Sequence, residues 1–201
     1  VTPAALLRAS PLPPLEARIL LTHVLGWRHT QLITRSEDAL DSPVVERYRA
    51  LEARRAAGEP VAQLVGAREF FGLDFEVTPE VLIPRPETEL LVETALAALE
   101  NVSRPRVLDL GTGTGAIAVA IASTRPDARV WALDRSAQAL AVATRNATRL
   151  LDAGRPGGAV TLLQSDWYGS LDTSLHFDVI VSNPPYIASG DPHLSQGDLR
   201  F

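Results

Sequence analysis

The segment of this chain with the clearest chemical potential is a glycine-rich run, Asp109–Ala116, in which Gly111, Gly113 and Gly115 alternate with Thr112 and Thr114. It follows a short apolar run and precedes a helical pattern. Glycines at such a junction allow sharp turns and let a ligand approach without meeting a Cβ atom. The helix that follows offers free N–H groups. The run also fits the dinucleotide pattern G-x-G-x-x-G/A, so it predicts a nucleotide-like ligand without deciding which.

Two further side chains lie where such a ligand would need them. Asp134 ends the next apolar run, 19 residues beyond Gly115, and can accept hydrogen bonds from both hydroxyls of a ribose. The alternative role for Asp134, helix capping, can be filled by Ser136. Trp167, after Asp166, can cover an adenine face, although a tryptophan that simply packs is the alternative. NAD and S-adenosylmethionine both carry ribose and adenine, so these residues do not distinguish them.

The deciding feature is Asn183-Pro184-Pro185-Tyr186, which follows an apolar run. Consecutive prolines cannot continue a central strand because they donate no ladder hydrogen bond, so they predict a rigid turn. That turn presents the Asn183 amide and the Pro184 carbonyl, two acceptors suited to the NH₂ group of a planar amide or amine. Tyr186 adds an aromatic face that favours a cationic methyl donor. A purely structural strand exit would leave the coincidence with the other features unexplained.

The elements that must position these residues are strands alternating with helices. The strands are expected at Val107–Leu110, Val130–Asp134, Val160–Gln164 and Val179–Val181, and the helices at Ala116–Ser123 and Ser136–Leu151. Such alternation predicts a parallel sheet with crossover helices. Apolar strands without polar alternation are expected when both faces of the sheet are covered.

The chain up to about Gly66 has helical patterns. One helix is predicted from Pro14 to Leu25, with Gly26 as its stop and an apolar stripe of Ile19, Leu20, Val24 and Leu25. A second helix is expected to begin at Ser42 as N-cap, with Pro43 in the first turn. Its arginines, Arg47, Arg49, Arg54 and Arg55, are interpreted as a solvated face rather than a docking surface for an acidic partner.

Between these parts, apolar residues at positions 71, 73, 75 and 77 alternate with polar residues and glycine. This alternation predicts a strand with one buried face, within a short hairpin. Pro84-Arg85-Pro86 then interrupts the chain. A helix is expected from about Glu87 to Glu100, with Leu91, Ala95 and Leu99 on one side.

Composition excludes several classes of protein. The chain has 201 residues, 46% of them apolar, and a net charge of −5, which suits a globular protein and argues against a broad nucleic-acid-binding face. The absence of cysteine excludes a disulfide framework and a thiolate metal site, and the four histidines show no ligand spacing, so no metal is expected. No signal peptide or membrane span is recognisable, which predicts a cytoplasmic protein.

Taken together, these motifs resemble the HemK/PrmC family, the glutamine-N5 methyltransferases of peptide chain release factors. The resemblance is carried by Gly58–Ala62, Arg68–Phe71, Ile83–Glu89, Asp109–Ala116, Gln164–Trp167 and Ser182–Ile187, and by the tail Asp191–Phe201. It covers nearly the whole chain from Gly58 onward and is weaker before it. Gln63 departs from the pattern, because an aromatic residue is expected there.

The resemblance implies an α/β fold: a class I, Rossmann-like S-adenosylmethionine-dependent methyltransferase domain preceded by a small helical domain and a linking β-hairpin. The expected boundaries are a helical substrate-recognition domain at 1–66, a hairpin linker at 67–84 and the methyltransferase domain at 85–201. The family's sheet has seven strands, whereas four can be counted here. The fold is therefore expected to be truncated after the fourth strand, which would become an unprotected edge.

The resemblance also implies the reaction and its residues. The substrate would be the Gly-Gly-Gln glutamine of class I release factors, the methyl donor S-adenosylmethionine, and catalysis a matter of positioning and electrostatics. The expected catalytic residues are Asn183, Pro184 and Tyr186, and Pro185 joins them in binding substrate. The expected cofactor-binding residues are Arg85, Thr88, Gly111, Thr112, Gly113, Thr114, Gly115, Asp134, Trp167 and Asn183. A monomer without membrane or sequence-specific nucleic-acid binding is expected.

Three alternatives remain open from the sequence. Methylation of adenine N6 or guanine N2 in nucleic acid uses similar Asn-Pro-Pro-Tyr motifs, but the chain lacks a basic recognition module. An NAD-dependent dehydrogenase would fit the glycine run and Asp134, yet would leave Asn183-Pro184-Pro185-Tyr186 without a role. A binding module that keeps the fold without activity is the third.

Overall fold

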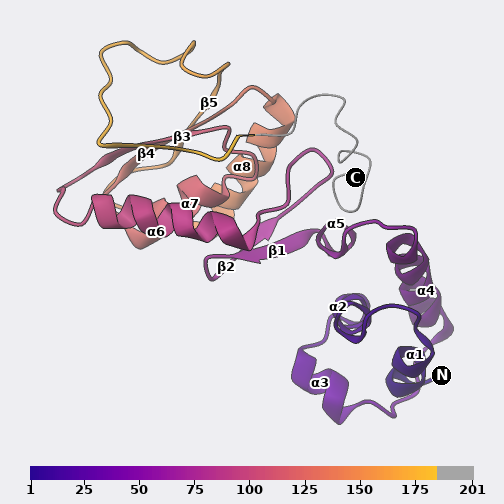
Figure 1. Ribbon diagram of the computed structural model, residues 1–201. Helices are drawn as coiled ribbons and strands as arrows, with labels where there is room; N and C mark the ends of the chain where they lie inside the picture. Colours follow the sequence, from indigo (N-terminus) through magenta and orange to yellow (C-terminus); the bar gives the residue numbers. More distant parts are fainter. Residues whose placement is uncertain (185–201) are drawn as a thin grey trace. The chain divides into compact units, whose positions relative to one another are not determined.

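The computed structural model describes residues 1–184, which form two compact units that divide between Gly66 and Ala67 (Figure 1). The first unit consists of helices, as predicted, and the second contains a hairpin and a parallel α/β sheet. Each unit has a hydrophobic core of its own.

The helical unit contains α1 (Pro3–Ala9), α2 (Pro14–Leu25), α3 (His29–Thr34), α4 (Ser42–Ala56) and α5 (Val61–Val65). Helix α2 has the predicted bounds, with Pro14 in its first turn and Gly26 in the left-handed conformation at its end. The core of the unit is made by Leu6, Leu20, Leu21, Leu32, Tyr48 and Leu64.

Two predictions for this unit were wrong in detail. Ser42 is the first residue of α4 and not its N-cap; Asp41 takes that position. Pro43 lacks an N–H group, but N–H groups in the first turn have no partner within the helix. The helix can therefore begin at Ser42, one residue before the predicted start. On α2, Ile19 is 38% exposed and the buried residues are Ala17, Leu20 and Leu21. Ile19 lies two positions from both Ala17 and Leu21, which places it on another side of the helix.

The arginine-rich helix α4 is not a uniformly solvated face. Arg47, Arg49 and Arg54 are exposed, as expected, but Arg55 is half-buried and pairs with Glu16 of α2. Its Nε and Nη2 donate to the two carboxylate oxygens of Glu16 at 2.7 and 2.9 Å. This two-pronged ion pair joins α2 to α4.

The second unit begins with an antiparallel hairpin of β1 (Ala67–Phe70) and β2 (Leu73–Glu76). The predicted hairpin is present, but the strand expected from Phe71 begins later, because Phe71 and Gly72 form the turn. Both have positive φ, 54° and 74°, as a tight hairpin turn requires. The Phe71 N–H donates to the Glu89 carboxylate at 3.0 Å, which helps to hold this residue in the turn.

A parallel sheet follows, with β3 (Arg106–Leu110), β4 (Arg129–Asp134), β5 (Thr161–Gln164) and β6 (Val179–Ser182) in the order β5-β4-β3-β6. The 3₁₀ turn η1 (Pro86–Thr88) and α6 (Glu89–Ala98) precede it, and α7 (Ala116–Thr124) and α8 (Ala137–Leu150) connect strands within it. The four strands and both crossover helices agree with the predicted ranges to within a residue or two. This is the strand order of a Rossmann-like half-sheet.

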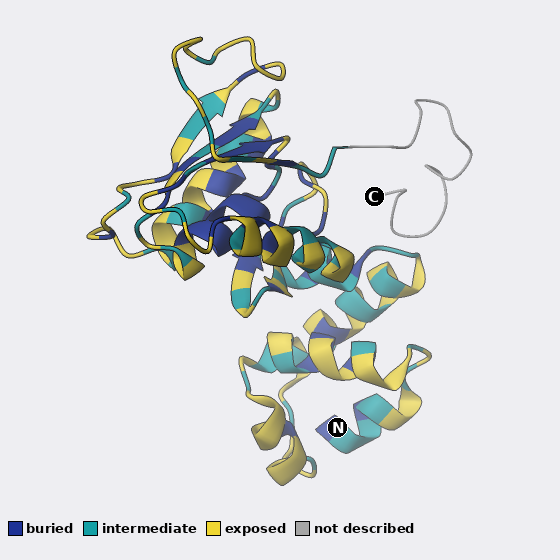
Figure 2. Ribbon diagram, turned by 60° about the vertical axis from the view of Figure 1, so that its left-hand side comes forward, coloured by how far each residue is buried: buried dark blue, intermediate teal, exposed yellow. Residues whose placement is uncertain are grey.

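Helices α6, α7 and α8 lie on one face of the sheet (Figure 1). Every residue of α7 from Ala116 to Ala122 is buried, as the dark colour of this helix in Figure 2 shows. On the opposite face, Leu108, Leu110 and Leu133 are covered by Leu171 and Phe177 from the segment between β5 and β6. The central strands are thus covered on both sides, which explains their continuous apolar character.

One buried polar side chain joins the hairpin to the sheet. Asn146 of α8 is fully buried; its Oδ1 accepts from the Glu76 N–H at 2.8 Å and its Nδ2 donates to the Glu76 carbonyl at 3.0 Å. The Nδ2 group also donates to the carbonyl of Thr114 at 3.0 Å. Arg145 reinforces the connection with an ion pair to the Glu76 carboxylate at 2.7 Å. Asn146 therefore links the hairpin edge directly to the glycine-rich run.

We expect Asn146→Ala to lower the free energy of unfolding by about 2–3 kcal/mol, because three backbone groups lose their partner. The hydroxyl of the exposed Thr148 on the same helix donates to the Thr144 carbonyl at 2.8 Å, so Thr148→Ala serves as control and should change stability by less than about 0.5 kcal/mol. Urea unfolding measures both values. Equal effects of the two substitutions would contradict the linking role of Asn146.

Candidate functional site

The carboxyl ends of the four parallel strands meet at one edge of the sheet. Leu110 of β3 pairs in register with Leu133 of β4 and Ser182 of β6, and Asp134 pairs with Gln164 of β5. The residues that directly follow these strands, up to Pro184 after β6, therefore begin side by side. This edge, where the strand order reverses about β3, is where open α/β sheets bind ligands.

The glycine loop, Gly111–Gly115, folds back over the end of β4. The N–H groups of Gly111 and Thr112 both donate to the Leu133 carbonyl, at 2.8 and 2.9 Å, and the Gly115 N–H donates to the Thr112 carbonyl at 2.8 Å. Gly111, Gly113 and Gly115 have φ values of 73°, 55° and 81°, in the region that glycine adopts without steric cost. The loop therefore depends on all three glycines for its backbone path.

The three glycines differ in what surrounds them. A Cβ atom at Gly111 or Gly113 would meet nothing within 4 Å, so both face open space at the ligand edge. A Cβ atom at Gly115 would lie 3.2 Å from the Cβ of Ala143 on α8. The first two glycines thus leave room that a ligand can occupy, and the third allows α7 and α8 to pack closely.

Asp134 lies beside this loop. One carboxylate oxygen, Oδ2, accepts from the Gly113 N–H at 2.9 Å, and the other accepts from the Ser136 N–H at the same distance. Ser136 caps α8 through its own hydroxyl, which accepts from the Ala139 N–H, as predicted. Each carboxylate oxygen can accept a second hydrogen bond, so Asp134 keeps two acceptor positions for a diol.

Asp109, the first residue of the glycine-rich run, is fully buried beneath the loop. Its Oδ2 accepts from the Thr112 hydroxyl at 2.6 Å, while Oδ1 has no hydrogen-bond partner within the described residues. Burial raises the pKa of Asp109 to about 6, against the hydrogen bond from Thr112, which lowers it. The loop therefore lies over a carboxyl group that is costly to ionise.

Trp167 follows β5 at the same edge. The residue is 54% exposed, so it does not serve as a core residue, and its φ of 50° is unusual for a bulky side chain. The buried Ser165 holds this turn: its hydroxyl donates to the Trp167 carbonyl at 2.8 Å and accepts from the Ser170 N–H at 3.0 Å. The indole is thus presented at the edge by a fixed backbone.

Asn183 follows β6 and meets the segment before α6. Its Nδ2 donates to the hydroxyl of Thr88 at 3.0 Å, and the neighbouring Ser182 hydroxyl donates to the Leu110 carbonyl at 2.8 Å. Arg85 is the half-buried N-cap of η1, and its carbonyl accepts from the Thr88 N–H. Pro184 is the last described residue, and the predicted site residues Pro185 and Tyr186 lie outside the described part of the chain.

Sequence reasoning assigned no role to Asn146, Asp109 or Ser165. A signal existed for Asn146, because it continues the buried stripe of Ala139, Val142 and Ala143 at helical spacing. A polar residue on such a stripe needs internal partners. For Asp109 the signal was an acidic residue among the apolar Val107, Leu108 and Leu110 of the strand. Nothing in the pattern distinguishes Ser165 from the other serines that follow β5.

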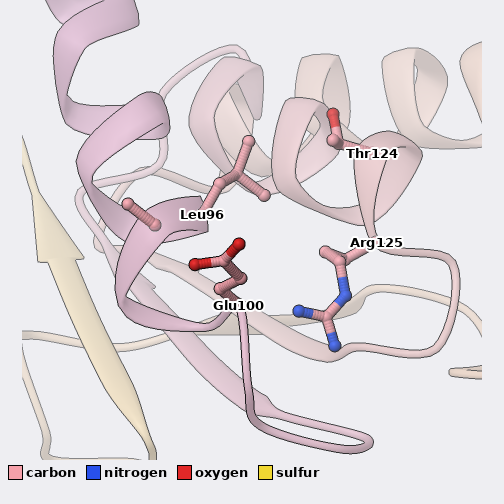
Figure 3. A pocket seen from close by; sticks show the side chains of 5 residues that line it. Leu96, Glu100, Thr124 and Arg125 are labelled. Carbon is pink, nitrogen blue, oxygen red and sulfur yellow. The ribbon is translucent and has the colours of Figure 1, made fainter.

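A cavity of about 440 Å³ lies away from this edge, lined by Leu96, Ala97, Glu100, Thr124 and Arg125 (Figure 3). It lies at the carboxyl end of α7, whereas the glycine loop precedes the amino end of the same helix. The Arg125 guanidinium donates to the Leu99 and Val102 carbonyls at 2.6 and 2.7 Å. This cavity belongs to the packing of the helix ends.

Comparison with known proteins agrees with this geometry. Residues 4–66 match the PrmC N-terminal domain, and residues 86–196 match the methyltransferase small domain. The strand order and glycine loop, taken with the second match, define a Rossmann-like, S-adenosyl-L-methionine-dependent methyltransferase domain.

Curated relatives narrow the class. The chain is 68% identical over 200 residues to the release factor glutamine methyltransferase of Burkholderia pseudomallei, covering 100% of this chain and 70% of that protein. The enzymes of the same name from Bordetella pertussis and Escherichia coli are 55% and 49% identical, covering 94% and 97% of this chain and 68% of each relative. The chain belongs to the family of release factor glutamine methyltransferases, as its motifs predicted.

Among the described helices, none has the length and apolar character to cross a membrane.

The surroundings of the glycines predict unequal effects of substitution. Gly115→Ala should lower the free energy of unfolding by about 2–3 kcal/mol, since a strained backbone adds to a tight contact with α8. Gly113→Ala is the matched control and should cost only the backbone strain, about 1–2 kcal/mol. Urea unfolding without ligand measures both. If Gly113→Ala lowered the free energy of unfolding as much as Gly115→Ala or more, the tight contact between Gly115 and α8 would be contradicted.

The raised pKa of Asp109 predicts a pH dependence. The native state holds this proton up to about pH 6, whereas the unfolded chain releases it near pH 4, so stability from this group is present below pH 4 and lost as pH rises to 6. Asp109→Asn should remove this contribution and make the fall in stability between pH 4 and pH 7 smaller by about 2 kcal/mol. Urea unfolding across this range measures the difference. Parallel profiles for both proteins would contradict a raised pKa.

Proposed function

We propose that this chain transfers a methyl group from S-adenosyl-L-methionine to the side-chain amide nitrogen of the glutamine in the Gly-Gly-Gln motif of class I peptide chain release factors. The observation that carries the proposal is the position of Asn183, beside the glycine loop at one sheet edge, in a chain whose relatives bear the name release factor glutamine methyltransferase. The proposed domain boundaries are 1–66, 67–84 and 85–201.

The described residues fit this cofactor. When bound, S-adenosyl-L-methionine supplies a methyl group attached to a positively charged sulfur. Gly111 and Gly113 leave open space that the cofactor can occupy. The other residues of the loop assigned to the cofactor are Thr112, Thr114 and Gly115. We assign the methionine end to this loop, with Arg85 and Thr88 near the carboxylate. Two free acceptor positions on Asp134 suit the ribose hydroxyls, and the exposed indole of Trp167 suits the adenine.

The substrate nitrogen requires positioning. A carboxamide nitrogen is a poor nucleophile because its lone pair is delocalised into the carbonyl group, so orientation and electrostatics must supply most of the rate. We assign the Asn183 Oδ1 and the Pro184 carbonyl as acceptors of the two amide N–H groups. Pro185 and Tyr186 complete the proposed substrate site, with the tyrosine ring packing on the glutamine side chain. With both N–H groups bound to fixed acceptors, the amide nitrogen can be aimed at the methyl group in one orientation.

The release factor needs a second point of attachment, because a single glutamine offers little surface. We assign this role to the helical unit, which folds around its own core and matches the PrmC N-terminal domain. It would grip the release factor away from the reacting glutamine. The proposed setting is the cytoplasm, where release factors work, with the enzyme acting as a monomer.

The test of this function is mass spectrometry of a release factor after incubation with the chain and S-adenosyl-L-methionine. We expect one added methyl group, located on the Gly-Gly-Gln glutamine by fragmentation. DNA and RNA incubated in parallel should gain none. A methyl group on nucleic acid, or on a different residue of the release factor, would overturn the proposal.

Asn183→Ala should lower kcat for this methylation by about 100-fold or more, a loss typical for a group that contacts the reacting atoms. The Kd for S-adenosyl-L-methionine, measured by calorimetry, should change by less than about threefold. The exposed Asn101 provides the control, since Asn101→Ala should leave both values unchanged. A comparable loss of turnover and cofactor affinity would count against the assigned role of Asn183.

A further inference from the structure

We infer that Thr88 is a positioning residue that fixes the orientation of the Asn183 carboxamide. The inference rests on the proposed function of Asn183 and goes beyond it, because Thr88 then acts through Asn183 and not only through the cofactor. The observation is the hydrogen bond from Asn183 Nδ2 to Thr88 Oγ1, 3.0 Å long, which joins residues 95 positions apart.

Both partners of this bond are held by their surroundings. Thr88 ends the 3₁₀ turn η1, and its N–H donates to the Arg85 carbonyl at 3.0 Å. The next residue, Glu89, accepts the Phe71 N–H of the hairpin, and α6 then packs into the core through Val92 and Ala95. Thr88 therefore belongs to a segment fixed at both ends.

Asn183 is held from the side of the sheet. It follows β6 directly, and the Ser182 hydroxyl ties the end of this strand to the Leu110 carbonyl of β3 at 2.8 Å. The backbone of Asn183 is thus set by the sheet, but this leaves the terminal torsion of the side chain free. That torsion is broad and nearly two-fold for asparagine, so backbone placement alone does not decide where the oxygen lies.

The hydrogen bond with Thr88 restricts this torsion. An asparagine carboxamide has two N–H donors and one carbonyl acceptor. With Nδ2 committed to Thr88, the carbonyl oxygen Oδ1 remains to accept an N–H from the substrate. A carboxamide turned the other way would place its own donors against the donors of the glutamine amide. The Thr88 hydroxyl can itself donate or accept, so it holds the carboxamide plane in place, and the observed orientation, with Nδ2 toward Thr88, is the one that can bind the substrate.

The variant that tests this is Thr88→Val, which keeps the shape of the side chain and removes the hydroxyl. We expect kcat for release factor methylation, measured at saturating S-adenosyl-L-methionine, to fall about five- to tenfold, as for the loss of one hydrogen bond. The Kd for S-adenosyl-L-methionine is measured separately, because Thr88 is also assigned near the cofactor carboxylate. Thr88→Ser restores the hydroxyl and should return kcat to within twofold of the original. Thr94→Val, at an exposed position of α6, is the control and should change neither value.

A double-mutant cycle separates positioning from a general structural role. If Thr88 acts through Asn183, Thr88→Val should have no further effect on kcat in the Asn183→Ala background. Independent, additive losses in the cycle would overturn the inference. So would a cofactor Kd that rises with kcat unchanged, since Thr88 would then act on the cofactor alone.

A second readout needs no activity. The ¹⁵N side-chain amide signals of Asn183, assigned by their absence from the Asn183→Ala spectrum, should shift in Thr88→Val and return in Thr88→Ser. Unchanged signals in Thr88→Val would refute the contact. An original chain that methylates no release factor would refute the proposed function instead, and the amide signals would still decide whether Thr88 orients Asn183.

Discussion

The candidate site depends on the way the end of β4 captures the glycine loop. One carbonyl, that of Leu133, accepts two successive loop N–H groups, and the next residue, Asp134, accepts a third from Gly113 through its side chain. Because the loop is bonded to β4 and not only to β3, from which it emerges, the two strands must stay in register for the loop to keep its shape. The positions proposed to hold the methyl donor are thus set by strand pairing.

The sequence predicted most of this arrangement because its signals are local. Apolar runs of strand length, helical stripes and alternating glycines each report on residues close together in the chain. The same locality explains the errors. Ser42, Ile19 and Phe71 were each misplaced by a residue or by a helix face, where neighbouring positions carry nearly equal propensities. The prediction of the family was more robust, since it drew on motifs spread over much of the chain.

Contacts between distant segments could not be predicted from local patterns. The amide of Asn146 contacts both Glu76 and Thr114, and that of Asn183 contacts Thr88. These partners lie too far apart in the sequence for a helical or strand periodicity to indicate the contact. Asn183 and Thr88 were both expected site residues, but nothing in the pattern paired them, and Asn146 was assigned no role. Hydrogen bonds of this kind depend on tertiary packing to bring the partners within 3 Å, so they emerge only when the fold is complete.

The backbone at Trp167 has an evolutionary consequence. An exposed tryptophan with positive φ lowers the stability of the fold in two ways. The left-handed backbone is strained for a bulky residue, and the exposed part of the side chain contributes no hydrophobic stabilisation. Glycine at this position would relieve the strain at the expense of the indole. Selection for thermal stability alone would therefore tend to replace Trp167, whereas the proposed contact with adenine would favour keeping it.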